Sequence, residues 1–409
     1  MYDFANSGYT TVVLTAVYNV YFVNVVAGNE GRGTATFLWT LAVGIANALV
    51  LLSAPVLGAI ADHSAAKKRF LLVTTSGCVL FTALLATTGP GTVLWAMTCV
   101  VLATFMFASG ENFIAAFLPE IASSHNMGRI SAYGWSLGYM GGLLVLGLCL
   151  AYITWARGKG LPPEHYVPVT MLLVAGCFAL AALPTFVFLR ERAVPAPAPQ
   201  SYLAAGFARV RETLAHARRY QDLFRFLVTL VLYQSGINAV VVLAAIYAQQ
   251  EIGLSDAEVL WMILIVNITA ALGALLFGHV QDRLGSVPTL AITLLIWMAA
   301  LLWAFFLRAP WEIWGVANLI GLAMGASQSA GRALIGLFSP PGRSAEFFGL
   351  WGLAGKLASI LGPMAYGIIG YLTEGDHRLA LLSTLAFFAA GLLMLFTVDE
   401  RRGRLAAGT

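Results

Sequence analysis

Charged side chains are scarce in this chain. Asp, Glu, Lys and Arg make up 10% of its 409 residues, whereas roughly 25% is usual for a soluble domain. Hydrophobic residues make up 59%. This composition excludes an ordinary soluble domain and indicates an integral membrane protein. The apolar runs are continuous rather than alternating, which excludes membrane β-barrel strands as well.

The signatures of common enzymes and metal sites are missing too. The sequence has no phosphate-binding P-loop and no His-x-x-x-His zinc site, and its Ser, His and Asp residues are scattered. The four cysteines lie inside apolar runs without metal-ligand spacing, and we interpret them as small packing residues: Cys78, Cys99, Cys149 and Cys177. We therefore expect no enzyme activity, no cofactor, no metal and no nucleic-acid partner.

Long apolar runs dominate the sequence. A helix needs about 20 apolar residues to cross the hydrocarbon core of a bilayer, and twelve runs of about that length predict an all-α membrane protein with twelve spanning helices. The runs cover approximately residues 4–27, 35–60, 70–88, 92–118, 130–156, 167–189, 223–249, 257–281, 288–307, 311–337, 346–372 and 378–398. The first run is too long, and lacks the basic start, of a cleavable signal peptide.

The placement of basic residues predicts the orientation. If the N-terminus is inside, most Lys and Arg residues between the runs fall on the cytoplasmic side, including the cluster Lys67, Lys68 and Arg69. The opposite loops hold only Arg32, Arg157, Lys159, Arg308 and Arg378. This asymmetry predicts that both termini are cytoplasmic. The expected location is the inner (cytoplasmic) membrane of a cell.

The runs fall into two halves, residues 1–189 and 222–409, which a linker over 190–221 connects. The linker begins with a stiff spacer over 195–199. Apolar residues then recur at helical spacing, with arginines on the other faces: Leu203, Phe207, Val210 and Leu214. This pattern predicts an amphipathic helix on the inner membrane surface. An ordinary solvated linker helix is the alternative.

One motif occurs at the same place in both halves. Gly58 to Asp62 and Gly278 to Asp282 each follow a long apolar run and precede basic residues, which predicts a short polar turn between two spanning helices. A carboxylate there can accept hydrogen bonds from a neighbouring helix N-terminus and pair with arginine. We predict that such contacts latch the inner side shut. The gating candidates are Asp62, Arg69, Glu120, Arg129, Asp282 and Arg283.

Three ionisable residues lie inside predicted spans, where a charge is costly and a function is the default hypothesis: Glu111, Arg332 and Lys356. Glu111 precedes Pro119, and Arg332 precedes Pro340, by the same interval, so opposite charges occupy equivalent positions of the halves. Three roles are open for these two residues. They form a structural or gating pair, they contact a substrate that carries both charges, or Glu111 couples transport to protons. Lys356 pairs with Glu111, contacts a substrate carboxylate, or extends toward the interface.

Polar and aromatic residues share these depths in the predicted helices. Together with the three charges they predict a site between the halves, lined by the first, fourth, fifth, seventh, tenth and eleventh helices. The substrate-binding candidates are Asn6, Tyr9, Glu111, Asn112, Trp135, Tyr139, Gln234, Asn238, Gln328, Arg332, Trp351 and Lys356.

Several segments resemble known transporters. The Gly-x-x-x-Asp motifs resemble the loop motif of the major facilitator superfamily. The opening Tyr-Asp-Phe-Ala-Asn-Ser-Gly-Tyr over 2–9 is similar to the Tyr-Asp-Trp-Ala-Asn-Ser-Ala-Tyr of the vacuole effluxer family, although Phe4 and Gly8 replace Trp and Ala. Residues 116–121 and 129–139 also resemble that family. The resemblance implies a secondary transporter with two six-helix halves, and its fungal members are associated with releasing amino acids from the vacuole.

We therefore predict a monomeric secondary transporter that moves a small solute by alternating access. An amino acid or a similar zwitterion is the leading substrate, and protons are one candidate coupling ion. Two other functions remain open. One is export of amphipathic compounds or lipids, and the other is a membrane receptor or scaffold that does not transport.

Overall fold

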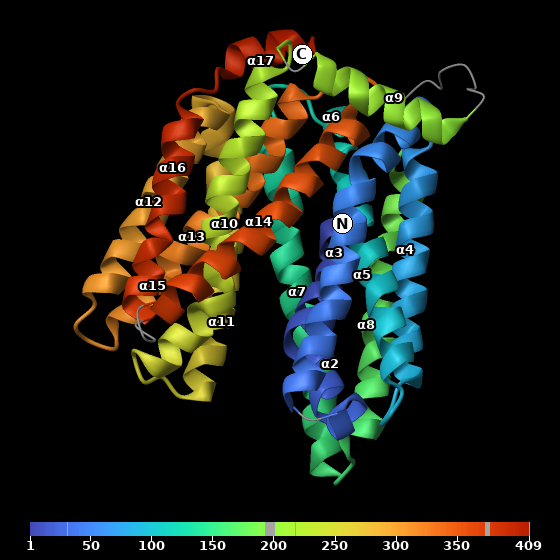
Figure 1. The fold of residues 1–409 in the computed structure, drawn as a ribbon, viewed down its shortest axis with the longest axis vertical. Coiled ribbons are helices and arrows are strands. Elements are labelled where there is room, and N and C mark those ends of the chain that lie inside the picture. The colour runs from blue at the N-terminus through green and yellow to red at the C-terminus, as the bar shows by residue number, and fades with distance from the viewer. Residues whose placement is uncertain (31, 193–200, 217, 373–376, 409) are drawn as a thin grey trace. The chain divides into compact units, whose positions relative to one another are not determined.

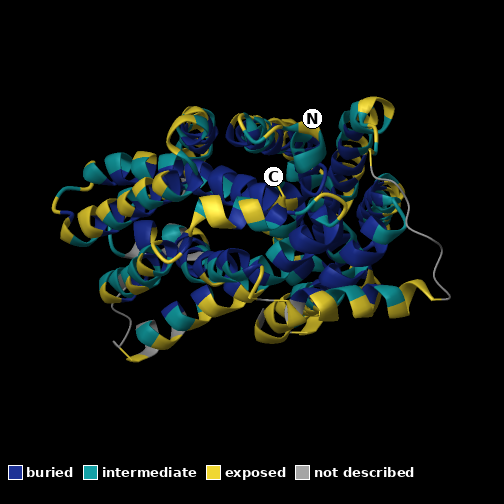
Figure 2. Cartoon of the chain, turned by 90° about the horizontal axis from the view of Figure 1, so that it is seen from above, coloured by how far each residue is buried: buried dark blue, intermediate teal, exposed yellow. Residues whose placement is uncertain are grey.

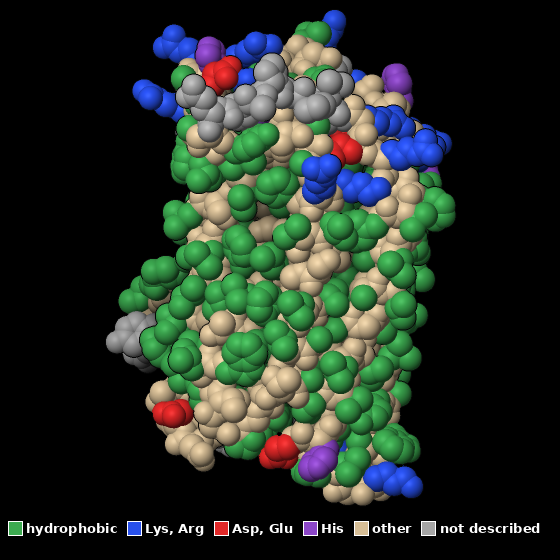
Figure 3. All heavy atoms as spheres, turned by 90° about the vertical axis from the view of Figure 1, so that its right-hand side faces the viewer, with side chains coloured by type: hydrophobic (Ala, Val, Ile, Leu, Met, Phe, Trp, Pro, Cys, Tyr) green, Lys and Arg blue, Asp and Glu red, His purple; other side chains and the backbone are tan. Residues whose placement is uncertain are grey.

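The structure of the protein is a computed structural model that describes residues 1–30, 32–192, 201–216, 218–372 and 377–408 (Figure 1). Within these ranges the regular structure is entirely helical. Eleven of the described helices are long and apolar enough to cross a membrane. On the face drawn in Figure 3, hydrophobic side chains fill the middle, and Lys and Arg side chains gather mainly at one end. The all-α membrane fold is thereby confirmed.

The first run is an irregular helix, made of α1 (Tyr2–Gly8), η1 (Tyr9–Ala16), α2 (Tyr18–Tyr21) and η2 (Phe22–Val26), and a short turn η3 (Gly28–Glu30) follows it. The η1 and η2 segments are π-helical. The remaining elements before the linker are α3 (Arg32–His63), α4 (Lys67–Leu84), η4 (Leu85–Thr87), α5 (Val93–Ala115), α6 (Leu118–Ile121), α7 (Met127–Gly158) and α8 (Pro163–Phe188).

The linker contains α9 (Tyr202–Ala215), and its predicted spacer over 195–199 lies outside the described residues. The later elements are α10 (Gln221–Gln250), α11 (Asp256–Leu284), α12 (Ser286–Phe306), α13 (Glu312–Phe338), α14 (Ser344–Leu372), α15 (His377–Ser383), α16 (Leu385–Leu395) and α17 (Glu400–Ala407).

Helix α13 corresponds to the tenth predicted run but is too polar to count among the eleven apolar spans, since it carries Gln328 and Arg332. Its last two turns are almost entirely buried. A Cβ atom on Gly325 would lie 1.8 Å from the carbonyl oxygen of Ala270, so the glycine permits close contact with α11. Helix α13 therefore packs against other helices along a face that a lipid-facing helix would fill with larger apolar residues.

The chain divides into two compact units. Unit 1 contains residues 1–54, 64–114 and 137–196, and unit 2 contains 55–63, 115–136 and 197–409. The boundaries of these units differ from those of the predicted halves. The end of α3 and the segment from α6 to the start of α7 belong to unit 2, together with the second half.

In unit 1, the hydroxyls of buried tyrosines in the first run form hydrogen bonds with threonine hydroxyls of neighbouring helices. The hydroxyls of Tyr2 and Thr75 share a hydrogen bond of 2.8 Å, as do those of Tyr9 and Thr104. A Cβ atom on Gly141 would lie 2.2 Å from the carbonyl oxygen of Phe4, so α7 and α1 touch at the backbone. The glycines of α7 are therefore a helix-packing surface.

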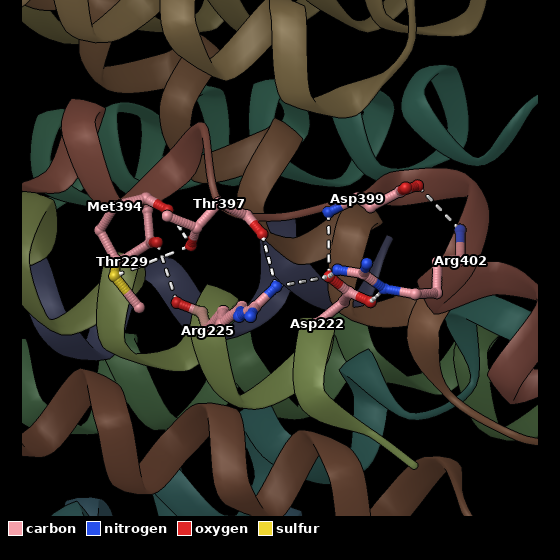
Figure 4. Close-up of polar contacts among 7 residues, drawn as sticks. All are labelled: Asp222, Arg225, Thr229, Met394, Thr397, Asp399 and Arg402. Carbon is pink, nitrogen blue, oxygen red and sulfur yellow. Dashed lines mark hydrogen bonds and ion pairs between the residues drawn. The ribbon is translucent and has the colours of Figure 1, made fainter. Parts of the chain in front are cut away.

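In unit 2, the start of α10 is bound to the last helix of the chain (Figure 4). The Asp222 carboxylate accepts hydrogen bonds of 2.6 and 2.7 Å from Arg402 and one of 2.9 Å from the Asp399 backbone. This bidentate contact raises the pKa of the Arg402 guanidinium. Arg225 donates to the carbonyl of Thr397 at 2.9 Å, which adds a second link between α10 and the segment before α17.

A carboxylate caps the third helix of each predicted half. Glu191 accepts hydrogen bonds from the backbone of Lys67 (2.7 Å) and Lys68 (3.1 Å) at the start of α4, within unit 1. Glu400 accepts from the backbone of Ser286 (2.7 Å) and Val287 (3.2 Å) at the start of α12, within unit 2. The internal repeat therefore extends to the residues that follow the last helix of each half.

We expect Glu191→Gln and Glu400→Gln each to destabilise the protein by about 1 kcal/mol, because a charged cap complements the helix dipole better than an amide. Thermal unfolding in detergent measures the loss. Glu164→Gln is the matched control, since Glu164 is exposed in the first turn of α8. Equal melting temperatures for all three variants would contradict the capping role.

Candidate functional site

The predicted site residues are distributed over both units. Unit 1 holds Asn6, Tyr9, Arg69, Glu111, Asn112 and Tyr139. Unit 2 holds Asp62, Glu120, Arg129, Trp135, Gln234, Asn238, Asp282, Arg283, Gln328, Arg332, Trp351 and Lys356. Unit 2 therefore contains both aspartates of the repeated motif together with the helix starts that they contact.

The first motif joins the end of α3 to the start of α14. Asp62 is buried, and its carboxylate accepts a hydrogen bond of 2.8 Å from the backbone nitrogen of Glu346. One turn earlier, a Cβ atom on Gly58 would lie 2.1 Å from the carbonyl oxygen of Ala345. The glycine thus permits backbone contact, and the aspartate places its negative charge at a helix N-terminus, where the dipole is positive.

The second motif repeats this construction between α11 and the start of α7. Asp282 accepts hydrogen bonds from the backbone nitrogen of Gly128 (2.9 Å) and from Nε of Arg129 (2.7 Å). A Cβ atom on Gly278 would lie 2.3 Å from Cβ of Ala132. Each motif therefore presents a glycine and an aspartate from one helix face to the first turn of another helix.

The motifs are not turns, and this expectation of the sequence analysis is wrong. Gly58 and Asp62 lie in the last turns of α3, and Gly278 and Asp282 lie in α11. Residues four apart share a helix face. The glycine and the aspartate of each motif therefore face the same neighbouring helix. The chain reverses afterwards, in one case at Gly285, whose φ of 91° favours glycine.

The other gating candidates differ in exposure. Arg69, Arg129 and Arg283 are exposed, and Glu120 is half-buried. Arg129 nevertheless forms the ion pair with Asp282. Their predicted part in gating stays a prediction.

One carboxylate in this region was missed by the sequence analysis. Glu346 is fully buried at the start of α14 and accepts a short hydrogen bond from the hydroxyl of Thr213 on α9. Nε of Arg209, also on α9, lies 3.5 Å from the same carboxylate. The signal was an acidic residue just inside an apolar run, which looked like an ordinary helix end.

Arg332 is a buried charge of unit 2, with 8% of its surface exposed. Its Nε donates to the hydroxyl of Ser131 (3.1 Å) and its Nη2 to the Ser131 carbonyl (2.7 Å). The guanidinium also lies 5.5 Å from the ring centroid of Trp135, a cation–π distance. The structure therefore brings two predicted site residues together, on α13 and α7.

The remaining candidates of unit 2 lie on helices that pack against each other. Gln234 and Asn238 are half-buried on α10, and Trp351 and Lys356 are half-buried on α14. A Cβ atom on Gly362 of α14 would lie 2.0 Å from the carbonyl oxygen of Ser235, so α10 and α14 are in backbone contact. Gln328 lies one turn before Arg332 on α13 and is half-buried.

In unit 1, the polar candidates gather on the first run and α5. Asn6 and Tyr9 are buried, and Glu111 is half-buried beside buried Asn112. Among the described residues, Nδ2 of Asn112 has no hydrogen-bond partner. Such a group is rare in a protein interior and often marks a functional position. Glu111 and Arg332 fall in different units, and their pairing stays a prediction.

These features define a class of protein. The helical membrane fold is that of transporters of the major facilitator superfamily, and the structure of a proton:xylose symporter, XylE, matches it with a TM-score of 0.75 at 14% identity, covering 99% of this chain and 96% of that one. The chain belongs to the vacuole effluxer Atg22-like family, whose model matches residues 23–408. The fold and family confirm a transporter of the major facilitator type.

Two relatives support this family assignment. An uncharacterized transporter of the major facilitator type from Bacillus subtilis, YxiO, is 26% identical over 405 residues, which is 98% of this chain and 94% of that protein. Autophagy-related protein 22 of Yarrowia lipolytica is 27% identical over 334 residues. That match covers 74% of this chain and 55% of the fungal protein, so the chain spans about half the length of this relative.

Proposed function

We propose that the protein is a secondary active transporter that moves a small zwitterion, such as an amino acid, by alternating access. The observation that carries the proposal is the buried guanidinium of Arg332 against Trp135. A charge inside a membrane helix is costly and is usually retained for function. Arginine binds carboxylates through two parallel hydrogen bonds, so Arg332 is the proposed partner of a substrate carboxylate.

The ammonium group of a zwitterion needs an acceptor, and Glu111 is the proposed one. It is a half-buried carboxylate in a predicted span and belongs to a polar group that includes Asn112. Protons are the proposed coupling ion, since a carboxylate at such a position can change its protonation state during the cycle.

We further propose that the protein lies in the plasma membrane with both termini in the cytoplasm. The distribution of Lys and Arg between the spans supports this orientation. In the orientation proposed, the contacts of Asp62 and Asp282 lie on the cytoplasmic side. Protease treatment of right-side-out vesicles tests the orientation. Tags at both termini should be protected in intact vesicles and cleaved after lysis.

A stability screen of the purified protein tests the substrate class. A ligand that binds only the folded state raises the melting temperature by mass action. We expect stabilisation by an amino acid, a weaker effect of the amine or the carboxylic acid that carries the same side chain, and no effect in Arg332→Gln. Uptake of the same amino acid into liposomes, driven by a proton gradient, confirms transport.

Two outcomes overturn the proposal in different ways. Stabilisation by carboxylic acids alone, without a contribution from an amino group, indicates an organic-anion exporter. Binding without exchange across liposomes indicates a receptor or scaffold.

A further inference from the structure

Helix α9 packs against the rest of unit 2 along one side. A Cβ atom on Gly206 would lie 2.8 Å from Cγ1 of Ile60, so α9 lies close against the end of α3. The Arg209 guanidinium donates to the carbonyl of Gly342 at 2.7 Å. Because Thr213 and Arg209 both contact buried Glu346, α9 connects the end of α3 to the start of α14.

A different side of α9 carries exposed apolar residues. Leu203 and Phe207 have 61% and 62% of their surfaces exposed. Each residue turns a helix by about 100°, which places both on one flank of the docked side. Their helical spacing in the sequence also includes Val210, which is half-buried, and Leu214, whose side chain lies outside the described residues. The docking face is instead formed by Gly206, Arg209 and Thr213.

Exposed arginines accompany this flank. Arg211 follows Phe207 by one helical turn, and Arg218 and Arg219 lie just after the helix; all three are exposed. In Figure 2, α9 is the helix that follows the longer grey trace, and many of its residues are coloured as exposed. In the sequence, α9 lies between the end of α8 at Phe188 and the start of α10 at Gln221. Because both of those helices are candidate membrane spans, the connection keeps α9 near the bilayer surface.

We propose that α9 is a binding surface for anionic phospholipid. Leu203 and Phe207 insert at the level of the headgroups, and Arg211, Arg218 and Arg219 bind lipid phosphates. Apolar residues beside arginines are the pattern of helices that lie in a membrane interface. Because the docked side of α9 contacts Glu346, bound lipid also strengthens the connection between α3 and α14. This proposal is independent of the transported solute.

Spin labels on single introduced cysteines test the insertion. Labels replace Leu203 or Phe207, and controls replace Ala204 or Ala208, which are exposed on another side of α9. The protein is placed in nanodiscs of phosphatidylcholine with or without phosphatidylglycerol. We expect the labels at 203 and 207 to be accessible to oxygen, and those at 204 and 208 to a water-soluble relaxant. Equal accessibility to the water-soluble relaxant at all four positions means a solvated linker helix and overturns the proposal.

The lipid charge is tested by thermal unfolding in the same two kinds of nanodisc. We expect phosphatidylglycerol to raise the melting temperature of the unaltered protein. Each of Arg211→Gln, Arg218→Gln and Arg219→Gln should weaken the apparent affinity for phosphatidylglycerol roughly fivefold, the equivalent of about 1 kcal/mol for a surface charge.

Arg401→Gln is the matched control, because Arg401 is exposed on α17, outside the proposed surface. The control should keep the full response to phosphatidylglycerol. If Arg401→Gln loses as much as the α9 variants, the response reflects net charge alone and the proposed surface is wrong. The same holds if phosphatidylglycerol has no effect on the unaltered protein.

Discussion

Gly58→Ala is expected to separate the end of α3 from the start of α14 and to slow transport roughly tenfold or more, as a loss of 1–3 kcal/mol of packing energy implies. The added Cβ would lie 2.1 Å from the carbonyl oxygen of Ala345 and 2.9 Å from the backbone nitrogen of Glu346. These are backbone atoms and cannot rotate away, so the helices themselves must shift. The hydrogen bond from Glu346 to Asp62 then lengthens as well.

Gly44→Ala is the matched control, because the same substitution in the same helix meets nothing within 4 Å. Alanine there should leave transport unchanged and stabilise α3 slightly, since glycine is a poor helix former. Spin labels at His63 and Pro341, both in unit 2, report the separation. We expect a longer and broader distance distribution in Gly58→Ala only.

Asp62→Asn should act in the same direction with a smaller effect. The asparagine oxygen can still accept the hydrogen bond from Glu346, but the charge at the helix N-terminus is lost. If Gly58→Ala transports at the normal rate with an unchanged distance distribution, the contact is only structural and its proposed part in gating is wrong.

The sequence was sufficient to predict the helices and the chemistry of the repeated motif. Long apolar runs leave few alternatives to a spanning helix, because every backbone group must be satisfied within the membrane. A carboxylate beside a helix end has one favoured kind of partner, the N-terminus of another helix. The sequence therefore predicted what Asp62 and Asp282 bind, though not which helices supply the partners.

The partners could not be read from the sequence because they are distant along the chain. Asp62 and the backbone of Glu346 are 284 positions apart, and only packing brings them together. Asp282 pairs with Arg129, 153 positions away, while the adjacent Arg283 is exposed. The docked side of α9 was hidden for a related reason: a glycine, an arginine and a threonine form it, and this combination has no apolar signal.

Arg332→Gln is expected to abolish transport while the protein still folds, and Arg332→Lys is expected to reduce transport roughly 10- to 100-fold. Hydrogen bonds to charged groups contribute about 1.5–3 kcal/mol each. Lysine keeps the charge but lacks the planar fork with which Arg332 reaches the Ser131 hydroxyl and carbonyl together. It also lacks the delocalised guanidinium that lies 5.5 Å from the ring centroid of Trp135. Both variants should retain a cooperative thermal transition in detergent.

Uptake into liposomes and ligand-induced stabilisation together locate the defect of these variants. A binding role predicts that both signals fall in parallel, whereas a purely structural role lowers the melting temperature without ligand and leaves ligand stabilisation in place. Arg401→Gln is the control for the loss of one arginine. Glu111→Gln should match Arg332→Gln, and the double variant should be no worse than either, because residues that act as one unit are non-additive. Near-normal uptake by both single variants would make Asn6, Gln234, Asn238 and Lys356 the better candidates.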